Sequence, residues 1–349
     1  MYLTKNKAMI VRWGLIIALY LIIIVAIGVG SVSVAPIDVW NILKSKIINT
    51  DSINTVSLAV QDIIWEIRTP RVILAAVSGA GLALAGLVMQ ASVQNPLAEP
   101  FILGIASGAS VGAVVAILLG GMLTVHGITL GVASGAFIGA IVATLGVLLL
   151  AGIRQRLSTV RLILAGAVVS ALCTAISNFI IYMAADAEGM QSAAFWTMGS
   201  LADAKWSGLF LPVLVVALMC AYFLSQVRNL DALLLGEEAA VTLGIDATKQ
   251  RRIYMALIAL LTGVLVSQCG IIGFVGLVIP HMVRSFVGAG HRQLLPAVIL
   301  FGAIFLVLAD LLSRVLLPSG DLPIGIITAL MGAPLLMKLL FGNSKNFGG

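Results

Sequence analysis

WEIRTPRVILAAVSGAGLALAGLVMQASVQNPLAEP, residues 65–100, is the stretch that decides the fold of this chain. No charged residue lies between Val72 and Met89. These residues rise about 1.5 Å each in a helix and nearly cross a hydrocarbon core of about 30 Å. Small residues dominate the segment, and its glycines are Gly79, Gly81 and Gly86. Because small residues let helix backbones approach each other in lipid, the stretch predicts a membrane helix inside a bundle.

The rest of the chain has the same apolar character. Hydrophobic residues make up 61% and charged residues 10% of its 349 residues, whereas soluble domains are about 25% charged. The composition therefore predicts an all-α polytopic membrane protein, a single transmembrane domain over residues 1–349, and excludes a soluble fold. Ten charge-poor runs predict ten helices, near residues 9–31, 71–91, 101–120, 127–151, 162–183, 207–227, 253–269, 271–289, 294–314 and 323–341.

The distribution of positive charge predicts the orientation. With the N-terminus placed inside, 14 of the 20 Lys and Arg residues fall on the cytoplasmic side and 6 outside, as the positive-inside rule requires. Both termini are then cytoplasmic, and we expect a multi-pass protein of a bacterial cytoplasmic membrane. The basic balance reflects this topology, so no nucleic-acid partner is expected. The three cysteines lie in predicted spans without paired spacing, which favours packing over disulfides or metal ligation.

Two outer connections contain amphipathic segments. In the connection 32–70, Pro36 is followed by IDVWNILKSKI, whose apolar residues have helical spacing. This predicts a short helix in the membrane interface with Trp40 as its anchor. A second such segment, at 192–206, carries Trp196 and Trp206. Both segments are consistent with covering the outer mouth of a pathway or with simple anchoring.

The longest cytoplasmic connection, residues 228–252, is too polar to span a membrane but has helical spacing. Gly244 favours a left-handed stop, and Asp246 can cap a following turn. The pattern predicts two short helices across the cytoplasmic face, either a surface that a partner binds or a connector without partners.

Six motifs, in order along the chain, resemble one family of membrane permeases. They are IRTPR at 67–71, QNPLAEP at 94–100, LGIASGAS at 103–110, GEEAAVTLG at 236–244, GFVGLVIPHMVR at 273–284 and LPIGIITALMGAP at 322–334. The chain is similar in these motifs to the FecCD and cobalamin-importer permeases, the membrane subunits of type II ATP-binding-cassette (ABC) importers.

The resemblance implies several partners. They are a second permease subunit, identical or related, two ABC ATPase subunits, an extracytoplasmic binding protein and the surrounding lipid. The sequence contains no G-x-x-x-x-G-K-[ST] phosphate loop. The chain is therefore expected to bind no cofactor and to catalyse no reaction, with ATP–Mg bound in the partner ATPase.

The resemblance also assigns site residues. It places the ATPase-coupling surface at Glu237, Glu238, Ala240, Leu243 and Gly244. It places the cytoplasmic gate at Asn95, Leu97 and Thr159, although Val160 stands where the cobalamin permease has a serine.

Arg68 and Arg314 match arginines that dock the binding protein in the cobalamin importer, and an outward arginine suits bidentate pairing with a carboxylate. An alternative remains open for each. Arg314 follows Asp310 by four residues, and Arg68 lies near Asp62 and Glu66, so internal ion pairs also explain these charges.

The sequence therefore predicts the permease of an importer that moves a metal chelate into the cytoplasm by alternating access, with iron-siderophore favoured over haem or cobalamin. The alternative is a secondary transporter driven by an ion gradient. Such transporters have charged groups at midplane, and Asp310 lies near the end of its span. His126, His281 and His291 have no metal-ligand spacing. We expect His126 and His291 in loops and His281 in helix packing, and no catalytic constellation supports an enzyme.

Overall fold

The computed structural model describes residues 5–30, 34–48, 57–120, 124–125, 128–129, 131–152, 159–184, 186–317 and 320–342. The first half of these comprises α1 (Lys5–Gly28), α2 (Pro36–Ile48), α3 (Leu58–Asp62), a π-helical turn η1 (Ile63–Arg68), α4 (Thr69–Val93), a 3₁₀ turn η2 (Pro100–Leu103), α5 (Ile105–Leu119), β1 (Thr124–Val125), β2 (Ile128–Thr129), α6 (Val132–Ala151) and α7 (Thr159–Met183). The second half comprises α8 (Ala187–Thr197), α9 (Trp206–Ser225), α10 (Val227–Leu234), α11 (Glu237–Thr242), α12 (Ala247–Cys269), α13 (Val275–Val287), α14 (His291–Val315) and α15 (Ile324–Gly342).

All ten predicted spans correspond to helices, which confirms the all-α polytopic fold. Within the described residues, seven helices are long and apolar enough to cross a membrane, and three apolar helices are shorter. Several predicted boundaries differ by four to six residues; α12, for example, begins at Ala247 and not near residue 253. The helix predicted from residue 127 begins at Val132, after the antiparallel pair β1–β2. The span predicted over 271–289 contains the 13-residue α13, because Phe274 adopts a left-handed conformation and starts the helix late.

The helix α4 lies in the interior of the bundle, as its small residues predict. In the most apolar stretch of 18 residues within Leu58–Val93, 83% of the residues are buried, whereas in that of α1 11% are buried. A methyl group built on Gly79 would overlap the carbonyl oxygen of Gly302 in α14, and one built on Gly86 would overlap that of Gly276 in α13. These glycines therefore allow backbone-to-backbone packing that no larger residue permits.

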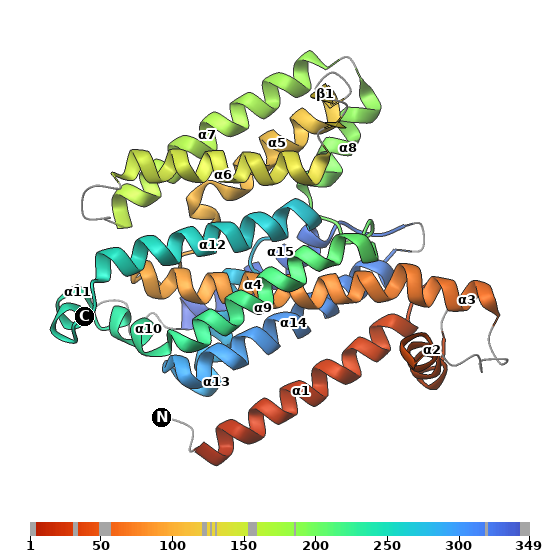
Figure 1. Cartoon of the computed structure of the whole chain (residues 1–349), viewed down its shortest axis with the longest axis horizontal. Helices are drawn as coiled ribbons and strands as arrows, with labels where there is room; N and C mark the ends of the chain where they lie inside the picture. The colour runs from red at the N-terminus through yellow and green to blue at the C-terminus, as the bar shows by residue number, and fades with distance from the viewer. Residues whose placement is uncertain are drawn as a thin grey trace.

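The long helices run broadly along one direction (Figure 1). Helices α5, α6 and α7 pack against one another, and α12 joins this group to α4 and α9. One end of the bundle carries α10, α11 and the start of α1, and is called the α10 end. The opposite end carries α2, α3 and α8, and is called the α8 end.

The predicted interfacial helix is present as α2. Of the predicted apolar stripe, Ile37, Trp40 and Ile47 are exposed and Leu43 packs against the core, while Val39 and Ile42 are buried. Trp40 makes an edge-to-face contact with Tyr20 of α1, with ring centroids 6.0 Å apart. The three exposed residues of the stripe are free to contact lipid headgroups, as the anchoring prediction requires.

Candidate functional site

The connection at the α10 end contains two short helices, α10 and α11, but the break between them lies at Gly236 and not at Gly244 as predicted, and the turn that Asp246 caps is the start of the long helix α12. Gly236 separates them with a φ of +110°, and Gly244 ends α11 with a φ of +79°, both in a region that favours glycine. Asp246 caps α12, because its Oδ1 accepts a hydrogen bond of 2.9 Å from Lys249 N. The predicted stop at Gly244 and cap at Asp246 are both confirmed.

The predicted coupling residues fall into two groups. Glu238, Leu243 and Gly244 are exposed on the α10 end. Glu237 pairs with Arg251 of α12 at 3.2 Å, and Ala240 is fully buried. In this structure Ala240 therefore supports the helix pair from within and offers no surface to a partner.

Three large apolar side chains lie exposed around the same turn. Leu235, Val241 and Leu243 are 71%, 61% and 62% exposed. With 8 and 6 residues, α10 and α11 are too short to span a bilayer. An exposed apolar patch rimmed by charged residues is typical of a protein-binding surface.

His291 anchors α10 to the bundle. Its backbone N donates to Asp231 Oδ1 at 2.9 Å, and its Nδ1 lies 2.7 Å from the same oxygen. Burial alone would raise the pKa of Asp231, but the hydrogen bonds and charge of His291 outweigh it and hold that pKa below its ordinary value of 3.8. The prediction that His291 is a loop residue was wrong, because it begins α14 and is fully buried. The two residues are 60 positions apart, so no local pattern signals this contact.

The predicted gate loop follows α4 at the same end. Gln94 adopts a left-handed conformation with a φ of +53° and ends α4 immediately before Asn95. Asn95 Oδ1 accepts a hydrogen bond of 2.9 Å from Leu97 N, which closes a local turn and leaves the Leu97 side chain 43% exposed. Thr159 is the first residue of α7, and its side chain lies outside the described residues. The assignment of Asn95, Leu97 and Thr159 to a gate stays a prediction.

At the α8 end, buried ionic groups join α4 to α14. Arg71 Nε bonds Asp310 Oδ1 at 2.7 Å, and Arg71 Nη1 pairs with Asp321. Arg314 Nε lies 3.1 Å from Asp310 Oδ2, which confirms the predicted i, i+4 ion pair. Asp310 is fully buried, so its charge is balanced by two arginines within the protein. The sequence missed the role of Arg71, which lies 239 positions from Asp310.

Arg68 and Arg314 also close the end of α1. Arg314 donates to the carbonyl oxygens of Ala26 and Val29, at 2.9 and 3.0 Å. Arg68 Nη1 donates to those of Ile27 and Gly28, at 3.1 and 3.0 Å. The last carbonyl oxygens of a helix lack intrahelical donors, so the two arginines satisfy this helix end together with Val34 N, which donates to the Gly28 carbonyl oxygen at 3.0 Å.

This placement bears on the predicted docking of a binding protein. Arg68 is 5% exposed, and the side chain of Arg314 is 7% exposed. Both guanidinium groups therefore hold internal partners in this structure. Their docking role stays a prediction, and it requires that these groups leave those partners or act through the surface they support.

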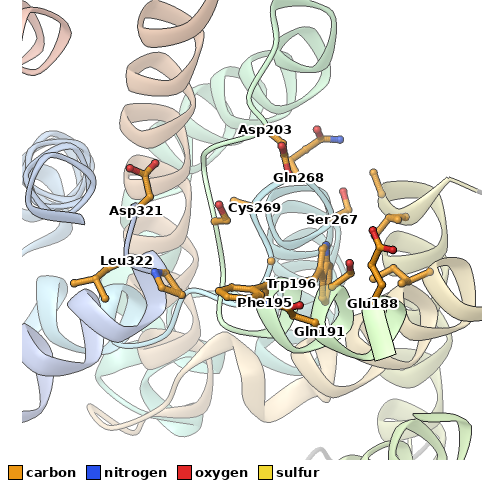
Figure 2. A pocket seen from close by; sticks show the side chains of 17 residues that line it. Glu188, Gln191, Phe195, Trp196, Asp203, Ser267, Gln268, Cys269, Asp321 and Leu322 are labelled. Carbon is orange, nitrogen blue, oxygen red and sulfur yellow. The ribbon is translucent and has the colours of Figure 1, made fainter. Parts of the chain in front are cut away.

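A pocket of about 690 Å³ opens at the α8 end. Figure 2 shows Glu188 and Asp321 on opposite sides of it, with Trp196 between them. Its walls come from α8, the end of α12 and the segment before α15. Carboxylate, amide and hydroxyl groups line it together with aromatic rings, so it suits a ligand with both apolar and hydrogen-bonding surface. The described residues contain no group of three or more His, Cys, Asp or Glu placed to hold a metal ion.

Comparison with known proteins decides the family. The sequence model of the FecCD transport family matches residues 17–342. The chain belongs to the FecCD transport family. Among its relatives, an ABC transporter permease protein of Methanocaldococcus jannaschii is 39% identical over 345 residues, covering 97% of this chain and 96% of that protein. The vitamin B12 import system permease protein BtuC of Klebsiella pneumoniae is 37% identical over 277 residues, covering 79% and 82%.

Solved structures agree with this FecCD assignment. A structure described as an inward-facing conformation of a metal-chelate type ABC transporter superimposes with a TM-score of 0.80 at 33% identity, covering 95% of this chain and 98% of that one. PsaBC from Streptococcus pneumoniae shares the fold, with a TM-score of 0.54 at 16% identity, covering 86% and 94%. As a FecCD member with several apolar spans, the chain is an integral membrane permease.

Proposed function

We propose that this chain is the permease subunit of an ABC importer that moves a metal chelate into the cytoplasm. The observation that carries the proposal is the FecCD match over 17–342, together with the exposed apolar residues of the α10 end. Relatives named as ABC transporter and vitamin B12 import permeases support the transport class.

The α10 end would face the cytoplasm and bind the ATPases. Leu235, Val241 and Leu243 would form the apolar centre of that interface, and Glu238 its charged rim. ATP–Mg would be bound by the two partner subunits, and this chain would bind no cofactor of its own.

The α8 end would face the extracytoplasmic binding protein and receive the cargo. The pocket there is large enough for part of a chelate, and its carboxylates and aromatic rings would contact the cargo surface. A second permease, identical or related, would complete the pathway. The exposed apolar side chains of α7, whose most apolar window is 22% buried, would face that partner or lipid. Among cargo classes we favour iron-siderophore, with haem and cobalamin as the other members of the same class.

The test is transport in proteoliposomes that contain this chain, its ATPase subunits and its binding protein. Radiolabelled ferric siderophore, haem and cyanocobalamin are offered separately, with ATP–Mg inside or outside. We expect uptake of one chelate that requires ATP–Mg on the α10 side and continues when ion gradients are collapsed. Uptake driven by an ion gradient without ATP would instead establish a secondary transporter and contradict the proposal.

A further inference from the structure

At each end of the loop 94–99, a side chain to which the sequence motifs assign no role makes a hydrogen bond to a distant part of the chain. At its start, Gln94 Nε2 donates a hydrogen bond of 2.7 Å to the carbonyl oxygen of Leu233 in α10. Leu233 is fully buried and lies two residues before the exposed Leu235. The loop is thus joined directly to the helix that borders the exposed apolar residues.

At its other end, Glu99 holds the start of α13. Glu99 Oε1 accepts a hydrogen bond of 3.2 Å from the backbone N of Phe274. Phe274 is the residue that precedes α13, and its φ of +68° is costly for a side chain as large as phenylalanine. The first amides of a helix lack internal partners and carry partial positive charge, so a carboxylate stabilises this terminus. The Phe274 ring lies against Gly332 of α15, where an added methyl group would overlap it.

The loop between these two contacts is stiff. Asn95 accepts hydrogen bonds from Leu97 N at 2.9 Å and, through its carbonyl oxygen, from Ala98 N at 3.0 Å. Pro96 and Pro100 restrict the backbone dihedrals on either side. A displacement of one end of such a loop is passed to the other end more completely than in a flexible linker.

We propose that Gln94 and Glu99 are positioning residues that couple α10 to the start of α13 through the loop 94–99. A movement of α10 then shifts the first turn of α13 and the Phe274 ring against α15. The coupling is carried by the Gln94–Leu233 hydrogen bond at one end, the Phe274–Glu99 hydrogen bond at the other, and the rigid segment between them. This proposal rests on the function proposed above, in which the ATPases bind the α10 end.

The test uses the complete complex with variants at both ends. Glu99→Leu removes the acceptor for Phe274 N, whereas Glu99→Gln keeps a carbonyl oxygen that can accept the same bond. Gln94→Gly removes the amide but suits the positive φ, and Gln94 is exposed, so this variant retains the fold. ATP hydrolysis, co-purification of the ATPases and chelate uptake are measured for each complex.

We expect Glu99→Leu and Gln94→Gly to bind the ATPases and hydrolyse ATP while uptake per ATP falls by about 5- to 150-fold, the usual range of coupling between sites. Glu99→Gln should retain most of the native uptake. The double variant Gln94→Gly/Glu99→Leu should transport no less than the poorer of the two single variants, because both substitutions act through one loop. Native uptake per ATP in Gln94→Gly would overturn the proposal, and so would equal losses in Glu99→Gln and Glu99→Leu. If Glu99→Leu does not fold, Gln94→Gly alone decides. Absence of ATP-driven uptake in the unmodified complex would overturn the proposed function instead.

Discussion

Replacement of Asp310 by asparagine tests the buried ionic cluster at the α8 end. Asp310 is fully buried and bonds Arg71 at 2.7 Å and Arg314 at 3.1 Å. Asp310→Asn keeps the side-chain shape but leaves two buried guanidinium groups without their shared carboxylate. Breaking a buried ion pair by removing one partner costs about 3–5 kcal/mol.

The surroundings place the expected loss in the lower part of that range. Arg71 retains Asp321, and Arg314 retains the carbonyl oxygens of Ala26 and Val29. We therefore expect Asp310→Asn to lower the free energy of unfolding by about 3–4 kcal/mol. Asp321→Asn is the matched control, because this carboxylate is 41% exposed and its pair with Arg71 is worth about 0–1 kcal/mol.

The assay is reversible unfolding in mixed detergent micelles, followed by circular dichroism. Each variant is compared with the unmodified protein under the same conditions. Equal stability of Asp310→Asn and Asp321→Asn would refute the reasoning, because it would show that the buried carboxylate does not balance the two arginines.

Three further predictions concern other parts of the molecule. Gly86→Leu should lower the free energy of unfolding by at least about 1–3 kcal/mol, because the leucine side chain overlaps the Gly276 backbone. Gly14→Leu is the control and should cause no such loss, because open space surrounds Gly14. The yield of monodisperse protein in size-exclusion chromatography measures the difference. The stabilisation that Asp231 provides is present above pH 3.8 and lost as pH falls through its lowered pKa, so the melting temperatures of native protein and Asp231→Asn should converge only below pH 3.8. Arg68→Glu should speed amide hydrogen exchange at residues 26–30 even without a binding protein, because the Ile27 carbonyl oxygen loses the Arg68 donor and the Gly28 carbonyl oxygen keeps only Val34 N. Native exchange there would instead favour a role in docking alone.

Local patterns were sufficient to predict the spans, the stop after α11 and the cap of α12, but not the break between α10 and α11 at Gly236. Long apolar runs, the left-handed stop at Gly244 and the cap at Asp246 are each encoded within a few residues. The ion pair between Asp310 and Arg314 was predicted for the same reason, since residues four apart share a helix face.

Contacts between distant residues were not predictable from one sequence. Arg71 meets Asp310 across 239 positions, and Glu99 meets Phe274 across 175. Charge and composition show that such groups need partners but do not identify them. The late start of α13 was missed for a related reason, because hydropathy measures the length of an apolar run and not the backbone turn at Phe274. The contacts that join distant elements of the bundle therefore required the folded structure.

The most direct test of the account is whether the α10 end binds the ATPase subunits. Tagged native chain, Leu243→Arg and Ser285→Arg are each co-expressed with the ATPase and purified, and the bound ATPase is quantified. Both variants add an arginine at an exposed position, but Ser285 lies in α13, outside the α10–α11 surface. The account predicts that Leu243→Arg loses most of the bound ATPase while Ser285→Arg retains it. Full retention of the ATPase by Leu243→Arg would contradict the central claim that this surface couples the permease to ATP hydrolysis.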